Sequence, residues 1–123
     1  MKLLIVDDSM MVRNSIERVF ADSRYFTDIK TAPDGVLALA QFQTFLPDVV
    51  TLDITMPNLD GLSTLDEMVK IHQDARILVI SALADRHTAI NAIKRGADLF
   101  ICKPFTDEEL KAALTELFES HAP

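Results

Sequence analysis

A short apolar run ends abruptly in two carboxylates at the start of the chain, in Lys2-Leu3-Leu4-Ile5-Val6-Asp7-Asp8-Ser9. Three further apolar runs end at a reactive polar residue, namely Val49-Val50-Thr51-Leu52 at Asp53, Ile77-Leu78-Val79-Ile80 at Ser81, and Leu99-Phe100-Ile101-Cys102 at Lys103. Continuous apolar runs are typical of strands buried inside a parallel sheet. The carboxyl ends of such strands meet at one edge, where ligands bind. We therefore expect three carboxylates, a hydroxyl and an amine to lie close together.

Segments of helical period separate the apolar runs along the chain. The pattern predicts strands at residues 2–6, 26–32, 49–52, 76–80 and 99–102, and helices around residues 12–20, 36–45, 62–69, 87–95 and 110–118. The segment 26–32 is more polar than the others, which favours an edge strand. Gly96 suits the position just after a helix end. Thr106 and Glu109 have the spacing of a capping box at a helix start.

This alternation predicts an α/β fold, a doubly wound five-stranded parallel sheet of the flavodoxin-like type. The expected strand order is 2-1-3-4-5, with right-handed crossovers. In that order the first and third strands are neighbours. Asp7, Asp8 and Asp53 should then lie side by side at the point where the strand order reverses.

The size and composition limit the classes of protein to which the chain could belong. A length of 123 residues suits one domain, which we take as residues 1–123. The formal net charge of −7 argues against direct nucleic-acid binding. No apolar stretch is long enough for membrane insertion. The single Cys cannot form an internal disulfide, so we expect a cytoplasmic protein.

The clustered side chains fit phosphoryl transfer onto a carboxylate. Two unit charges about 4 Å apart repel by roughly 4 kcal/mol at an effective dielectric constant near 20, so the cluster favours a cation. Carboxylates with open water positions suit Mg²⁺. We assign Asp53 as nucleophile, and Asp7, Asp8 and Asp53, together with the backbone carbonyl of Thr55, as metal ligands. Lys103 and Ser81 would contact phosphoryl oxygens.

Each of these residues alone also has a purely structural interpretation. An acidic pair after a strand is often a helix cap, and a lone lysine is usually a solvated charge. The joint occurrence at four strand ends is what favours a functional cluster.

Together these residues resemble the receiver domain of two-component response regulators, and closely the single-domain chemotaxis (CheY-like) type. The matching pieces cover essentially the whole chain: Val6-Asp7-Asp8-Ser9, Asp53 with Met56-Pro57 and Asp60-Gly61, Ser81-Ala82, Gly96-Ala97-Asp98 and Lys103-Pro104-Phe105. The resemblance implies that Asp53 accepts a phosphoryl group from a sensor histidine kinase in a Mg²⁺-dependent reaction. It implies that Asp7 and Asp8 bind the Mg²⁺, while Ser81 and Lys103 sense the phosphoryl group.

The resemblance also implies how the phosphorylated state would be transmitted. Phe100 stands at the family's aromatic switch position, where chemotaxis-type members often carry Tyr, so a switch here would work by packing. Partner binding would change on the surface of the fourth helix, fifth strand and fifth helix. The downstream target would be a protein, with the flagellar motor switch as the leading candidate. We expect a monomer or a phosphorylation-dependent dimer, and no enzyme activity beyond self-phosphorylation and self-dephosphorylation.

Several other functions remain open from the sequence. A phosphorelay shuttle, or the receiver of a multidomain regulator, would use the same residues. A haloacid dehalogenase-like phosphohydrolase also uses a strand-end Asp, but it needs a second Asp at the position of Thr55. A flavin-binding module needs a phosphate loop that Asp7 and Asp8 would repel. A scaffolding receiver that is never phosphorylated would not need the complete set of acids, Ser81 and Lys103.

Overall fold

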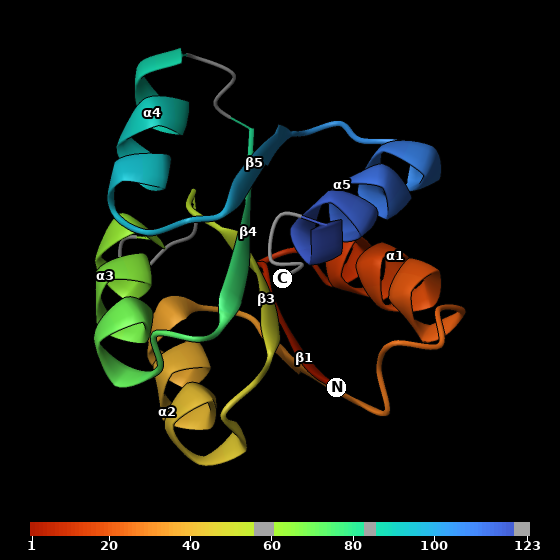
Figure 1. Cartoon of the computed structure of the whole chain (residues 1–123), viewed down its shortest axis with the longest axis horizontal. Coiled ribbons are helices and arrows are strands. Elements are labelled where there is room, and N and C mark those ends of the chain that lie inside the picture. The colour runs from red at the N-terminus through yellow and green to blue at the C-terminus, as the bar shows by residue number, and fades with distance from the viewer. Residues whose placement is uncertain (56–60, 83–85, 120–123) are drawn as a thin grey trace.

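The computed structural model describes residues 1–55, 61–82 and 86–119. Within these ranges five strands alternate with five helices, as the sequence predicts (Figure 1). The elements are β1 (Lys2–Val6), α1 (Met10–Ala21), β2 (Asp28–Ala32), α2 (Gly35–Phe45), β3 (Val49–Asp53), α3 (Gly61–Ile71), β4 (Arg76–Ser81), α4 (Arg86–Lys94), β5 (Leu99–Cys102) and α5 (Asp107–Glu119). None of the helices in these ranges has the length and apolar character needed to cross a membrane.

The strands form one parallel sheet in the order β2-β1-β3-β4-β5, which confirms the predicted topology. Helices α1 and α5 cover one face of the sheet, and α2, α3 and α4 cover the other (Figure 1). The register pairs Asp53 with Ile80 and Ser81 with Cys102. The reactive residues at the strand ends therefore lie along one edge of the sheet.

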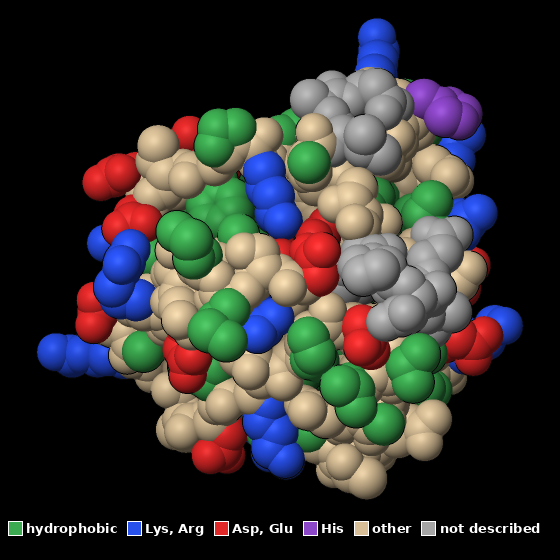
Figure 2. Space-filling view, turned by 180° about the vertical axis from the view of Figure 1, so that it is seen from behind, with side chains coloured by type: hydrophobic (Ala, Val, Ile, Leu, Met, Phe, Trp, Pro, Cys, Tyr) green, Lys and Arg blue, Asp and Glu red, His purple; other side chains and the backbone are tan. Residues whose placement is uncertain are grey.

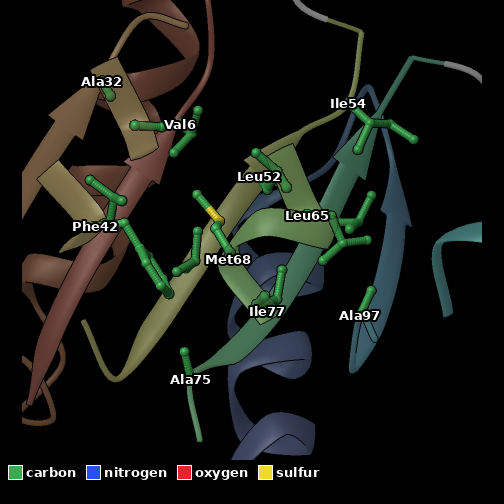
Figure 3. Packing of buried hydrophobic residues seen from close by; sticks show 14 of the residues in the cluster. Val6, Ala32, Phe42, Leu52, Ile54, Leu65, Met68, Ala75, Ile77 and Ala97 are labelled. Atoms are coloured by element: carbon green, nitrogen blue, oxygen red, sulfur yellow. The ribbon is translucent and has the colours of Figure 1, made fainter. Parts of the chain in front are cut away.

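Each face of the sheet carries its own hydrophobic cluster, because successive side chains of a strand point to opposite faces. On the α2–α4 face, Leu65 and Met68 of α3 point toward Leu52 and Ile77 of the sheet (Figure 3). Burial of one such side chain contributes about 1.5–3 kcal/mol. The two clusters fill the faces of the sheet, whereas the buried polar residues Asp7, Asp53 and Ser81 lie at its carboxyl edge.

The second strand is shorter than the sequence suggests, and the prediction that it starts at Phe26 is wrong. Phe26 packs in the core against the ring of Phe20 instead of joining the ladder, at a centroid distance of 5.6 Å. Thr27 donates its backbone N–H to the carbonyl of Met1, and the regular pairing begins only at Asp28. The position of β2 at the edge of the sheet is confirmed.

Local sequence signals at the helix ends are confirmed. Gly96 has a φ of 116° after α4, and the N–H groups of Gly96 and Ala97 donate to the carbonyls of Ile93 and Ala92. This is the hydrogen-bond pattern of a glycine helix stop. At the start of α5, the hydroxyl of Thr106 accepts from the N–H of Glu109 and donates to its carboxylate.

Candidate functional site

Asp53 and Asp7 occupy neighbouring positions at the carboxyl edge of the sheet. Asp53 is the last residue of β3, and Asp7 directly follows β1. Each is only 1% exposed, although both carry a carboxylate. Strands β1 and β3 are adjacent, so the two acids meet where the strand order reverses. The predicted placement of these two residues is confirmed.

The two oxygens of the Asp53 carboxylate have different surroundings. Oδ1 accepts hydrogen bonds from the backbone N–H of Thr55 at 2.9 Å and from the Thr55 hydroxyl at 2.6 Å. Oδ2 accepts a hydrogen bond from Nζ of Lys103 at 3.2 Å. The carboxylate is therefore held in one orientation by donors on two sides. A fixed carboxylate is what an in-line displacement at phosphorus needs from its nucleophile.

Lys103 carries the positive charge of the site. Its Nζ also lies 2.8 Å from Oδ2 of Asp7, so one ammonium group faces both buried acids. Burial alone would lower the pKa of Lys103, but the Asp7 and Asp53 carboxylates raise it overall. Burial raises the pKa of Asp7, and the nearby Lys103 ammonium offsets only part of that effect. The lysine is thus held in its charged form beside the acids.

The loop from β1 to α1 is tied together by its own hydrogen bonds. The N–H of Ser9 donates to Oδ1 of Asp7 at 2.9 Å, and Oγ of Ser9 accepts from the N–H of Val12, which caps α1. Nη1 of Arg13 donates to the backbone carbonyl of Asp7 at 2.7 Å. The contact of Arg13 was not predicted from the sequence, where its only signal is an arginine in the first helical turn after a capping serine.

The three acids fit a divalent cation. Asp7, Asp8 and Asp53 each offer a carboxylate oxygen, and these oxygens all lie within 4.8 Å of one another. Oδ2 of Asp7 is buried and, apart from its ion pair, has no hydrogen-bond partner in the described part of the chain. Asp8 is exposed, so water can complete the coordination. Hard oxygen donors with open water positions suit Mg²⁺. The carbonyl of Thr55 as a further ligand stays a prediction.

Ser81 and Phe100 lie close to this edge on β4 and β5. Ser81 is fully buried at the end of β4, and its carbonyl accepts the backbone N–H of Lys103 at 2.8 Å. This bond connects the predicted sensor residues through the backbone. Phe100 is half-buried and packs against the core on the α2–α4 face, on the strand position paired with Val79. Its role as a switch stays a prediction.

A hollow of about 510 Å³ opens beside Lys103. It is lined by residues from α1, from just after β4, from the segment after β5 and from the start of α5, namely Met11, Val12, Ser15, Ala82, Lys103, Pro104, Phe105 and Asp107. The lining is largely apolar, with the ammonium of Lys103 on one side.

The motif residues Met56, Pro57 and Asp60 lie outside the described residues. Gly61 begins α3 and packs so closely on Ile54 that a Cβ atom there would overlap the Ile54 backbone.

Comparison with known proteins points to a single family. Residues 3–115 match the family described as the response regulator receiver domain. The chain is 40% identical over 114 residues to the chemotaxis protein CheY of Listeria monocytogenes, covering 93% of this chain and 95% of that one. It is 41% identical over 113 residues to the probable transcriptional regulator ycf27 of Guillardia theta, covering 92% of this chain but only 43% of that protein.

The fold is likewise that of solved receiver structures. The crystal structure of the CheX–CheY–BeF3–Mg complex from Borrelia burgdorferi matches with a TM-score of 0.89 and 34% identity. The match covers 95% of this chain and 88% of that one. The resemblance inferred from the sequence is therefore confirmed at the level of fold and family.

Proposed function

Because the chain belongs to the family of response regulator receiver domains, we propose that Asp53 accepts a phosphoryl group from a sensor histidine kinase. The protein is a two-component response regulator, a signalling protein and not an enzyme that turns over a substrate. The observation that carries the proposal is the shared contact of Lys103 with the buried Asp7 and Asp53. We take residues 1–123 as one receiver domain.

In the proposed reaction, an oxygen of Asp53 attacks the phosphorus of the donor's phosphohistidine. A P–O bond forms and the P–N bond breaks, and its electron pair stays on the imidazole nitrogen of the donor. Lys103, already 3.2 Å from Asp53, would pair with a phosphoryl oxygen as negative charge moves into the site. The hydroxyl of Ser81 would donate a hydrogen bond to another oxygen. Transfer of this kind depends on positioning and charge neutralisation.

Receiver domains bind Mg²⁺ at an aspartate cluster, and Asp7, Asp8 and Asp53 form such a group here. We propose that these carboxylates and the backbone carbonyl of Thr55 hold Mg²⁺ in this protein. When bound, the ion supplies positive charge that neutralises the incoming phosphoryl group. The protein's own part is to keep the acids buried, oriented and close together.

The phosphoryl group would change the protein by shifting a conformational equilibrium. It adds about −1.5 to −2 charges at the site, by analogy with other phosphorylated residues. Ser81 would be drawn toward it, and Phe100 would repack inward without the hydroxyl contact of a tyrosine. The readout surface would be α4, β5 and α5, where Ile90 and Ile93 are exposed. A partner shifts the equilibrium only through its differential affinity for the two states.

The proposed partners follow from the site and from the relatives. We propose that the kinase docks beside Lys103, where a hollow opens whose lining includes the lysine that contacts Asp53. The relatives of matching length are chemotaxis proteins, so we propose a role in chemotaxis with a protein target such as the flagellar motor switch. The protein would act in the cytoplasm as a monomer or as a phosphorylation-dependent dimer.

Direct nucleic-acid binding is not part of the proposal, because the net charge is −7 and the Lys and Arg side chains on the face in Figure 2 are scattered. Two related roles use the same chemistry. In a phosphorelay shuttle the group would pass onward to another protein. The longer ycf27 relative, of which the match covers 43%, favours a receiver that works beside an output domain.

The proposal is tested with phosphoramidate, a small donor whose P–N bond resembles that of phosphohistidine. The expected result is one phosphoryl adduct that needs Mg²⁺ and is removed by hydroxylamine, which cleaves acyl phosphates but not phosphoserine. A hydroxylamine-resistant adduct would show that the phosphoacceptor is a hydroxyl group and not Asp53. Steady release of phosphate from a phosphomonoester would instead favour the phosphohydrolase alternative.

A further inference from the structure

Arg13 makes a contact with the acidic loop that the phosphoryl chemistry does not use. It lies in the first turn of α1, and its Nη1 donates to the backbone carbonyl of Asp7 at 2.7 Å. The N–H of Asp7 donates to Ala32 of β2, but the pairing of β1 with β3 ends one residue earlier, at Val6. Arg13 thus supplies a donor to a carbonyl that lies beyond the end of that ladder.

The position of this carbonyl gives the contact its consequence. The oxygen belongs to the peptide unit that joins Asp7 to Asp8, and a peptide unit is planar. Holding the oxygen therefore restrains the rotation of this unit, and with it the backbone from which the Asp7 and Asp8 side chains leave. On the other side of the loop, the N–H of Ser9 holds Oδ1 of Asp7 at 2.9 Å. Asp7 is therefore held at one carboxylate oxygen by Ser9 and at its backbone carbonyl by Arg13.

We propose that Arg13 is a positioning residue for the metal site, acting through the Asp7 carbonyl and not through a contact with the metal. This inference rests on the proposed Mg²⁺ site formed by Asp7, Asp8 and Asp53. The charge of Arg13 and its hydrogen bond have opposite effects on a cation. A positive charge near the acids repels Mg²⁺, whereas the hydrogen bond preorganises the ligands. Removal of the side chain therefore distinguishes the two effects. Mg²⁺ affinity falls if the hydrogen bond is the larger effect, and it rises if the charge repulsion is the larger effect.

The test is calorimetric titration of Mg²⁺ into the full chain and its variants in the absence of any phosphodonor. Arg13→Met removes both the charge and the donor, and Arg13→Lys keeps a charged donor of similar length. Arg18→Met is the matched control, because Arg18 lies on the same helix and is 68% exposed. Within the described part of the chain, Arg18 forms an ion pair with Asp107 alone, at 3.8 Å. Circular dichroism in EDTA verifies that each variant is folded.

We expect Arg13→Met to bind Mg²⁺ roughly tenfold more weakly, as for other groups that orient metal ligands. Arg13→Lys should keep most of the affinity, and Arg18→Met should lose none. Unchanged or tighter binding by Arg13→Met would overturn the proposal, because repulsion would then be the larger effect. If Arg13→Met does not fold, Arg13→Leu, which likewise lacks both the charge and the donor, replaces it with the same expected direction. A wild-type protein that binds no Mg²⁺ would instead overturn the metal site itself, and this inference with it.

Discussion

The ammonium nitrogen of Lys103, which follows β5, lies 3.2 Å from Oδ2 of Asp53 at the end of β3. Strand β4 lies between these two strands in the sheet, so the lysine reaches across a full strand to the acid. The same nitrogen is 2.8 Å from Asp7, and the side chain of Lys103 is 20% exposed. A single partly buried cation therefore balances two buried carboxylates.

Replacing Lys103 with methionine should lower the stability of the metal-free protein. Removal of one partner from a buried ion pair leaves uncompensated charge behind, which is strongly unfavourable. Saturating Mg²⁺ should restore part of the loss, because the metal takes over the neutralisation. Urea unfolding with EDTA and with Mg²⁺ measures both effects. The exposed Lys111→Met on α5 serves as control, and an equal loss with and without Mg²⁺ would argue against a shared charge balance.

The raised pKa of Asp7 predicts a pH dependence of stability. Because the folded state favours the protonated acid, the contribution of Asp7 to stability is greatest below its ordinary value of 3.8 and is lost as the pH rises through the raised pKa. In metal-free buffer, Asp7→Asn should therefore become more stable relative to wild type as the pH increases. Urea unfolding across this pH range tests the sign. If the free energy of unfolding of Asp7→Asn instead falls relative to that of wild type as the pH rises, the raised pKa of Asp7 is contradicted.

The same protonation should compete with metal binding. Metal ligands must be deprotonated, so Mg²⁺ affinity should fall as the pH is lowered toward the raised pKa of Asp7. Calorimetric titration at a series of pH values measures this, and proton release on binding should grow as the pH falls. An affinity that stays constant until the pH reaches the ordinary carboxylate value would contradict competition between Mg²⁺ and a proton held by the raised pKa of Asp7.

The hydroxyl of Thr55 should restrain the nucleophile. It donates to Oδ1 of Asp53 at 2.6 Å, which stabilises the unreacted carboxylate. In Thr55→Val the backbone N–H of residue 55 and Lys103 still orient the Asp53 carboxylate, so loss of about 1 kcal/mol of this stabilisation should speed acetyl phosphate labelling roughly fivefold. Thr55→Ser, which keeps the hydroxyl, should label at the wild-type rate. Slower labelling of the valine variant would show that the hydroxyl assists the reaction.

Gly61 should tolerate no side chain. A Cβ atom at this position would overlap the backbone of Ile54, one residue after Asp53, so backbone would have to move. We expect Gly61→Ala to cost about 1–3 kcal/mol of stability, the usual range for overpacking. The exposed Lys70→Ala on the same helix is the control. Equal urea midpoints for the two variants would contradict the close packing of Gly61 on Ile54.

The sequence located the site because the geometry of a parallel sheet is simple. Four apolar runs with polar ends were enough to bring Asp7, Asp53, Ser81 and Lys103 to one edge, since parallel strands end on the same side. What remained hidden depends on the conformation of loops. The hydrogen bonds of Thr55 and Arg13 follow from backbone turns after β3 and β1 that residue patterns do not determine.

The boundary of β2 shows a second limit. Phe26 is an aromatic residue of the kind that favours strands, but its ring packs in the core beside Phe20. The pairing of β2 with β1 therefore starts two residues later, at Asp28. Tertiary packing decided this, and local preference could not reveal it. The aromatic residue Phe100 poses the same problem, because a core residue and a switch residue look alike in sequence.

The most direct test of the account is the intact mass of the protein after incubation with acetyl phosphate, with and without Mg²⁺. Wild type should gain one phosphoryl group only when Mg²⁺ is present, and Asp53→Asn should gain none while keeping its fold. Labelling of Asp53→Asn to the wild-type extent would contradict the assignment of the phosphoacceptor. Wild type that is folded and loaded with Mg²⁺ but stays unlabelled by acetyl phosphate and by a phosphohistidine kinase would contradict the proposed function.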